Sequence, residues 1–164
     1  MAGEVSLSRL CALFTFLCMR IYLDTCTIQR PTDDMREDRV RLEAQAITEV
    51  VALIEAGEVE LVSSAVLKIE HERNRNRMRR GASAQVLALA TEVVQIDEAV
   101  DQRTQSYRML GLKGLDAAHL ACAVQAGVDF FCTCDYRFLR RAKKLETGLT
   151  RAVSPLELIQ EVQR

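Results

Sequence analysis

Four acidic residues occupy places in the sequence where an α/β protein commonly builds a functional site. Asp24 follows a predicted strand over 21–23, and Asp135 ends a predicted apolar strand that begins near Val128. Asp116 lies in the first turn of a predicted helix, and Glu70 lies about two turns into another. Ligands of open parallel sheets bind outside the carboxyl ends of the strands. We therefore expect these four acids to meet at that edge.

Carboxylates that converge in this way repel one another. At a separation of 4 Å each pair costs about 1 kcal/mol in water, and several times more at a lower dielectric constant. Such a cluster is tolerable if some acids are protonated or if a cation binds. The hard cations Mg²⁺ and Mn²⁺ prefer oxygen ligands and retain several waters. Together with nearby basic residues, this pattern favours metal-assisted hydrolysis of a phosphodiester.

A simpler interpretation of each acid remains open. An Asp at the start of a helix is commonly an N-cap, which would explain Asp116 and Asp135 separately. Glu70 could be a solvated helix residue. Asp24 is the acid that capping explains least easily, because a long loop is expected after it.

A run of arginines follows Glu70 on what we predict to be one continuous helix. Five arginines lie between positions 73 and 80. Arg73, Arg77 and Arg80 are spaced by four and three residues and would share one face, so they could contact the phosphates of an RNA. A solvated helix face is the alternative. Three residues after Asp116 stands His119, which we interpret as a histidine hydrogen-bonded where its helix meets the sheet.

Strands and helices alternate along the chain, which predicts an α/β fold with a parallel sheet and helices on both faces. The predicted strands cover 21–23, 59–62, 93–96, the segment before Asp135, and 151–153. A capping-box spacing from Asp34 to Glu37 predicts a helix start there, and Ser154 with Pro155 predicts another. Asp97 is expected to cap a helix that runs to Leu110.

The composition fits a single soluble domain. The chain has 164 residues and a net charge of −1, which gives no overall attraction to nucleic acid or membrane. Six cysteines without a CxxC pair argue against structural zinc and favour buried, reduced thiols. Reduced thiols are typical of a cytoplasmic protein.

The N-terminal residues do not match the rest of the chain. The apolar run over 10–18 is too short to cross a bilayer, and no signal-cleavage site follows it. Met19 directly precedes the first predicted strand and is an alternative natural start. We therefore divide the chain into an N-terminal extension, 1–18, and one domain, 19–164.

Four motifs in this order resemble those of PIN-domain proteins, and most of all the VapC-type toxin ribonucleases of toxin–antitoxin pairs. They are Ile21-Tyr-Leu-Asp-Thr25, Ser64 with Glu70, Leu115-Asp-Ala-Ala-His-Leu-Ala121, and Cys132-Thr-Cys-Asp-Tyr-Arg-Phe138. The resemblance covers nearly the whole chain from Met19. The 18-residue extension is a departure from typical members.

The resemblance implies a three-layer α/β/α fold and an endoribonuclease that depends on Mg²⁺ or Mn²⁺. Asp24, Glu70, Asp116 and Asp135 match the acidic quartet that holds the metal, with Thr133 as a supporting hydroxyl. The implied partners are an RNA substrate and a cognate antitoxin, and we also expect a homodimer and no membrane association.

Two rival functions belong to other classes. One is a regulatory or RNA-binding module with the same fold and no catalytic turnover. The other is a phosphoacceptor receiver domain, which needs a Lys close to its acids. The candidates, Lys143 and Lys144, lie eight or more residues beyond Asp135 on a predicted helix, which disfavours that reading.

Overall fold

The structure is a computed structural model and describes residues 18–164. A five-stranded parallel sheet lies at the centre of this part of the chain. The predicted extension over 1–18 lies outside the described residues, apart from Cys18. The strand order is β3-β2-β1-β4-β5, and all four pairings are parallel. The strands are β1 (Met19–Leu23), β2 (Val59–Ser64), β3 (Glu92–Val94), β4 (Phe130–Cys132) and β5 (Arg151–Val153).

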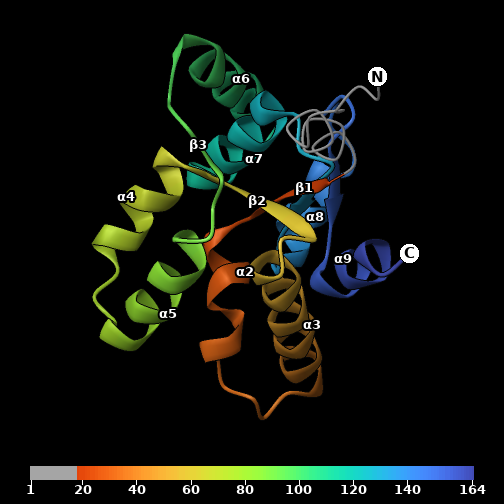
Figure 1. Ribbon diagram of the computed structural model, residues 1–164. Coiled ribbons are helices and arrows are strands. Elements are labelled where there is room, and N and C mark those ends of the chain that lie inside the picture. The colour runs from red at the N-terminus through yellow and green to blue at the C-terminus, as the bar shows by residue number, and fades with distance from the viewer. Residues whose placement is uncertain (1–17) are drawn as a thin grey trace, which may run out of the picture.

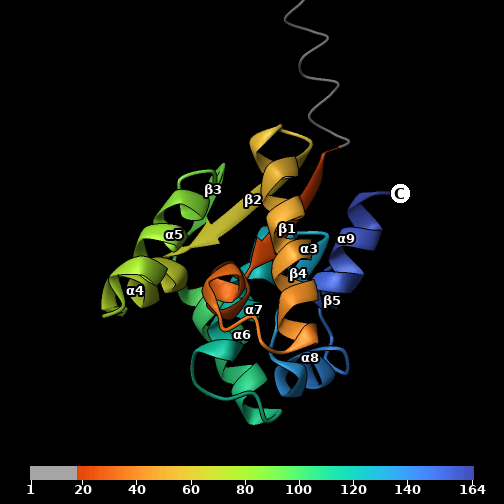
Figure 2. The same ribbon diagram turned by 90° about the horizontal axis from the view of Figure 1, so that it is seen from below.

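Helices cover both faces of this sheet, as predicted. They are α2 (Thr25–Gln29), the 3₁₀ turn η1 (Arg30–Thr32), α3 (Asp38–Glu55), α4 (Ala65–Arg73), α5 (Arg77–Leu87), α6 (Glu98–Met109), α7 (Gly114–Ala126), α8 (Tyr136–Ala142) and α9 (Pro155–Val162). The strands run between the α6–α7 pair and α3, which packs with α9 (Figure 1; Figure 2 shows the view from below). In the core between β1 and β4, Tyr22 stacks on Phe131 with ring centroids 5.7 Å apart.

Several helix boundaries follow the capping signals in the sequence. Asp97 caps α6 by accepting a hydrogen bond from Val100 N, and Ser154 forms the predicted capping box with Glu157. Gly127 ends α7 in the left-handed conformation, with φ of 62°, which glycine adopts without a Cβ penalty. These local signals were sufficient because each involves residues within one turn of the helix end.

Two predictions in the segment after β1 were wrong. Instead of a long loop, α2 begins directly after Asp24. The spacing from Asp34 to Glu37 does not open a helix, because Asp34 accepts a hydrogen bond from Arg36 N in a local turn. Helix α3 begins at Asp38, and Glu37 at its N-cap makes no side-chain capping bond.

The prediction of a single basic helix after Glu70 was also wrong. Helix α4 ends at Arg73 and α5 begins at Arg77. Between them, Asn74 Oδ1 accepts from Asn76 N at 2.9 Å, and Asn76 Oδ1 accepts from two N–H groups of the next helix. Arg73, Arg77 and Arg80 therefore do not share a face of one helix.

Within the described range the five cysteines are free, and Cys122, Cys132 and Cys134 are buried as predicted, whereas Cys18 is half-buried and Cys26 is exposed. None of the described helices combines the length and the apolar character needed to cross a membrane.

We expect Ser64→Ala to destabilise the fold by about 2 kcal/mol in urea unfolding. Ser64 Oγ accepts from Leu67 N as the N-cap of α4, and it also bonds the buried Tyr22 hydroxyl. The change removes a cap and leaves a buried hydroxyl with one partner fewer. Ser154→Ala, which removes only a capping box, should cost about 1 kcal/mol. A smaller loss for Ser64→Ala than for Ser154→Ala would contradict this view of the buried network.

Candidate functional site

The strand order brings two of the predicted acids to the same place. The chain leaves β1 for β2 on one side and returns through β4 on the other, so β1 and β4 flank the switch point of the sheet. Asp24 follows β1, Asp135 comes shortly after β4, and Asp24 N donates to Cys132 O at 3.2 Å. A cavity of about 310 Å³ lies there, and all four predicted acids line it.

Asp24 and Asp135 are each tied to the first turn of a helix. Asp24 Oδ1 accepts from Thr27 N at 2.9 Å, and Asp135 Oδ1 accepts from the N–H groups of Arg137 and Phe138. Asp24 is therefore an N-cap after all, and the expectation that capping explains it poorly was wrong. Among the described residues, Oδ2 of neither acid has a hydrogen-bond partner, so capping leaves one oxygen of each available.

Asp116 does not cap its helix. The N-cap of α7 is Lys113, and the Asp116 carboxyl lies in the first turn without a capping bond. Burial and, after it, the charges of Asp135 and Asp24 together raise its pKa to about 6. The repulsion expected from converging carboxylates therefore acts on Asp116.

Glu70 reaches the cavity from α4 and is held by a chain of hydrogen bonds. His119 Nε2 lies 2.6 Å from Glu70 Oε2, and the Thr25 hydroxyl donates to the same oxygen. His119 Nδ1 lies 2.8 Å from the Tyr22 hydroxyl, which lies 2.7 Å from Ser64 Oγ.

A neutral imidazole satisfies this chain when Ser64 donates to Tyr22, Tyr22 to His119, and His119 to an ionised Glu70. Burial acts to raise the pKa of Glu70, but the hydrogen bond from His119, the attraction of that imidazole when it is protonated, and the hydrogen bond from Thr25 together outweigh it and leave that pKa below its usual value. The interpretation of His119 as a hydrogen-bonded histidine where its helix meets the sheet is confirmed, and its partner proves to be one of the four acids.

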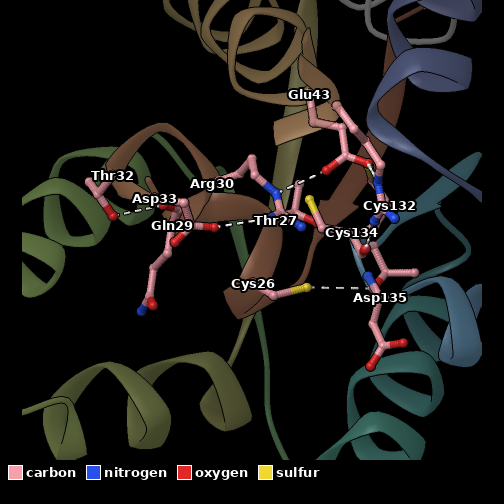
Figure 3. Close-up of polar contacts among 12 residues, drawn as sticks. Cys26, Thr27, Gln29, Arg30, Thr32, Asp33, Glu43, Cys132, Cys134 and Asp135 are labelled. Atoms are coloured by element: carbon pink, nitrogen blue, oxygen red, sulfur yellow. Dashed lines mark hydrogen bonds and ion pairs between the residues drawn. The ribbon is translucent and has the colours of Figure 1, made fainter. Parts of the chain in front are cut away.

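Thr133 lies two residues before Asp135 and is fully buried. Its Oγ1 accepts from Asp135 N at 3.1 Å and lies 3.6 Å from the Cys26 thiol. Figure 3 shows Cys26 on the Asp135 side of the α2 segment. Nothing in the sequence marks Cys26 as part of this cavity, because a cysteine next to a helix start carries no spacing signal.

Two arginines that sequence reasoning missed also line the cavity. Arg79, from α5, lies 2.7 Å from Asp33 Oδ1. Arg30 forms an ion pair with the buried Glu43 at 3.0 Å, although its N–H is poorly aligned for a hydrogen bond (Figure 3). The three arginines predicted to contact RNA, Arg73, Arg77 and Arg80, do not line it.

The donor set of the cavity suits a hard divalent cation. Carboxylate oxygens are the preferred ligands of Mg²⁺ and Mn²⁺, and a cation would offset the repulsion that Asp116 experiences. Among residues 18–164, no three acidic, histidine or cysteine side chains stand close enough to share an ion as they are placed. The residues therefore fit a metal by their chemistry, and the carboxylates would have to close around it.

Comparisons with known proteins give consistent results. A family model described as PIN domain matches residues 21–144. The crystal structure of PAE2754 from Pyrobaculum aerophilum has a TM-score of 0.55 and 15% identity, covering 90% of this chain and 97% of that one. The crystal structure of VapBC2 from Rickettsia felis, bound to a DNA fragment from their promoter, has a TM-score of 0.53 and 10% identity, covering 82% and 99%. A search of curated proteins found no significant match.

Asp116→Asn is expected to stabilise the metal-free protein increasingly as the pH rises. The pKa of Asp116 is about 6, against an ordinary 3.8, so the folded state holds this proton more tightly than the unfolded chain. Stability is therefore lost as the pH rises through that window, and the neutral amide avoids the loss. The advantage of the variant in urea unfolding should grow by about 1 kcal/mol across the window, allowing for solvent screening of a partly exposed group.

The control for this measurement is Asp97→Asn, because Asp97 caps α6 and does not line the cavity. This variant should not gain stability over the native protein as the pH rises. An Asp116→Asn advantage that is constant with pH would show that neither burial nor the neighbouring carboxylates raise the pKa of Asp116.

Proposed function

This chain belongs to the PIN-domain family, and from that premise we propose that it is a metal-dependent endoribonuclease that hydrolyses RNA phosphodiester bonds. The observation that supports the proposal most is that four acids from four separate elements line one cavity at the switch point of the sheet. No capping requirement explains Asp116 or Glu70 there.

The metal would be Mg²⁺ or Mn²⁺, held by Asp24, Glu70, Asp116 and Asp135. A bound divalent cation supplies a water of lowered pKa and offsets charge on the scissile phosphate. Capping of Asp24 and Asp135 restrains their carboxylates through Oδ1 and leaves Oδ2 of each free to bind the ion when the acids close around it.

The remaining residues of the site orient the acids. Glu70 is oriented by His119 and Thr25, so its carboxylate stays ionised and in place. Thr133 accepts the Asp135 N–H, which fixes the backbone where that acid leaves β4. We propose Thr133 as a supporting residue on this ground.

We further propose that the chain is the toxin of a two-gene toxin–antitoxin pair. The structural likeness to VapBC2 supports this at the level of the fold. A cognate antitoxin would cover the acidic cavity and could insert an Arg or Lys among the carboxylates, since charge-assisted hydrogen bonds to carboxylates are strong. A homodimer is expected, and light scattering in solution would test it.

We predict that Asp24→Asn lowers metal-dependent RNA cleavage by about 100-fold or more, because the change removes a charged ligand at the reacting centre. Cleavage of labelled RNA with Mg²⁺ or Mn²⁺, and with EDTA, measures the effect. The matched control is Asp97→Asn, which should cleave normally.

Metal binding gives an independent readout. Millimolar Mg²⁺ or Mn²⁺ should raise the melting temperature of the native protein, and Asp116→Asn should reduce that rise. Binding of RNA without any metal-dependent cleavage would favour the regulatory module with the same fold. Arrest of growth on expression, relieved by the product of an adjacent small gene, would establish the toxin role.

A further inference from the structure

A row of positive side chains leads away from the acidic cavity along α8. The row lines a shallow depression of about 440 Å³ and consists of Arg137, Arg140, Arg141 and Lys144. Arg140 and Arg141 lie three and four residues after Arg137, so these three share one face of α8, and Lys144 continues the row in the turn just beyond the helix end. The opposite face is buried in the core through Phe138, Leu139 and Ala142.

The depression along α8 is continuous with the acidic cavity. A third cavity, of about 180 Å³, lies between α8 and the turn that joins α6 to α7. It shares Asp116 and Asp135 with the acidic cavity, and it shares Arg137 and Arg141 with the depression along α8. Through these shared lining residues, the acidic cavity, the third cavity and the depression along α8 adjoin one another in succession.

The charges of this row are available to a ligand. Among the described residues, none of its four members has a carboxylate within 4.0 Å. By contrast, the two arginines inside the acidic cavity, Arg30 and Arg79, are paired with Glu43 and Asp33. Arg141 donates to Gly111 O and so also braces the turn before α7.

We propose that the α8 row, defined as Arg137, Arg140, Arg141 and Lys144, holds the phosphodiester backbone of a single-stranded RNA on one side of the cleavage position. The inference rests on the proposed function, because it takes the acidic cavity as the place where the RNA is cut. A row of cations that ends at an acidic, metal-suited centre matches a polyanion that reaches the metal through one of its phosphates. An acidic protein segment would match the row but would find only carboxylates at its end.

The first test measures equilibrium binding of an end-labelled single-stranded RNA of mixed sequence, in EDTA so that no cleavage occurs. The variant carries Arg137→Gln, Arg140→Gln and Lys144→Gln together, and it keeps Arg141 because that side chain bonds Gly111. We expect its Kd to rise by about tenfold or more and its salt slope to fall by about 2, at roughly 0.7 per phosphate on single strands. Melting temperatures of variant and native protein confirm that both are folded.

The comparison variant carries Arg73→Gln, Arg77→Gln and Arg80→Gln, which removes the same charge from the α4–α5 side. It should lose clearly less affinity than the α8 variant. An equal or greater loss would overturn the proposal, because the α8 row would then have no special place in the RNA path. Unchanged RNA binding by the α8 variant, with loss of binding to a protein partner, would assign the row to that protein and would also overturn it.

The second test uses RNAs shortened stepwise from the 5′ end or from the 3′ end. In the native protein, shortening from one end should weaken binding more than shortening from the other, because the row lies on one side of the cavity. The α8 variant should lose this asymmetry. The same loss of affinity from both ends in both proteins would contradict a one-sided track.

Cleavage of the same RNA with Mg²⁺ separates this inference from the proposed function. Native protein that cleaves RNA while the α8 variant binds it normally would overturn the inference alone. Binding that depends on the α8 row, in a native protein that never cleaves, would overturn the proposed function and leave the RNA surface standing.

Discussion

The direct pairing of β1 with β4 is the constraint on which the site depends. It places the carboxylates of Asp24 and Asp135 at one edge of the sheet, where their like charges oppose each other. Each acid compensates by accepting backbone N–H groups of the helix that follows it, through one oxygen only. Capping and metal binding, which appear from the sequence to be competing explanations, are therefore compatible: the cap restrains the carboxylate and leaves its second oxygen toward the cavity. Asp116 has no capping bond, and burial together with the charges of Asp135 and Asp24 raises its pKa to about 6.

The position of the fourth acid depends on the core in a different way. Glu70 lies on α4, whose start is capped by Ser64, and the same hydroxyl bonds Tyr22 of β1. Tyr22 bonds His119 of α7, and His119 bonds Glu70. A buried polar chain of this kind is stabilising only when every member is satisfied, so it fixes the distance between α4 and α7. It thereby sets where Glu70 stands relative to Asp116, with no contact between the two acids themselves.

The sequence predicted the fold class, the place of each of the five strands and the meeting of the four acids at one cavity, because these depend on local periodicity and on the rule for parallel sheets. It failed where short polar side chains compete with the helix for backbone hydrogen bonds. Asn74 and Asn76 break the basic helix in this way, and hydrophobic periodicity contains no signal of it. It also missed Arg79, because a single side chain's direction follows from where α5 packs against α2. RNA contact by Arg73, Arg77 and Arg80 stays a prediction, now without the shared face that motivated it.

The arginines of this chain serve two separate purposes, and burial distinguishes them. Those nearest the acids are paired: Arg30 offsets the charge of Glu43, which is 1% exposed, and Arg79 ties α5 to Asp33. An unpaired arginine inside the cavity would compete with a metal ion for the four carboxylates. Because Arg30 and Arg79 are paired with Glu43 and Asp33, the four carboxylates keep the negative charge that attracts a cation. The cations of the α8 row lie beside the site on a solvent-facing surface, where an unpaired charge costs little and remains free to bind phosphate. The net charge of −1 therefore does not reveal that an acidic centre and a basic surface stand at different places in the molecule.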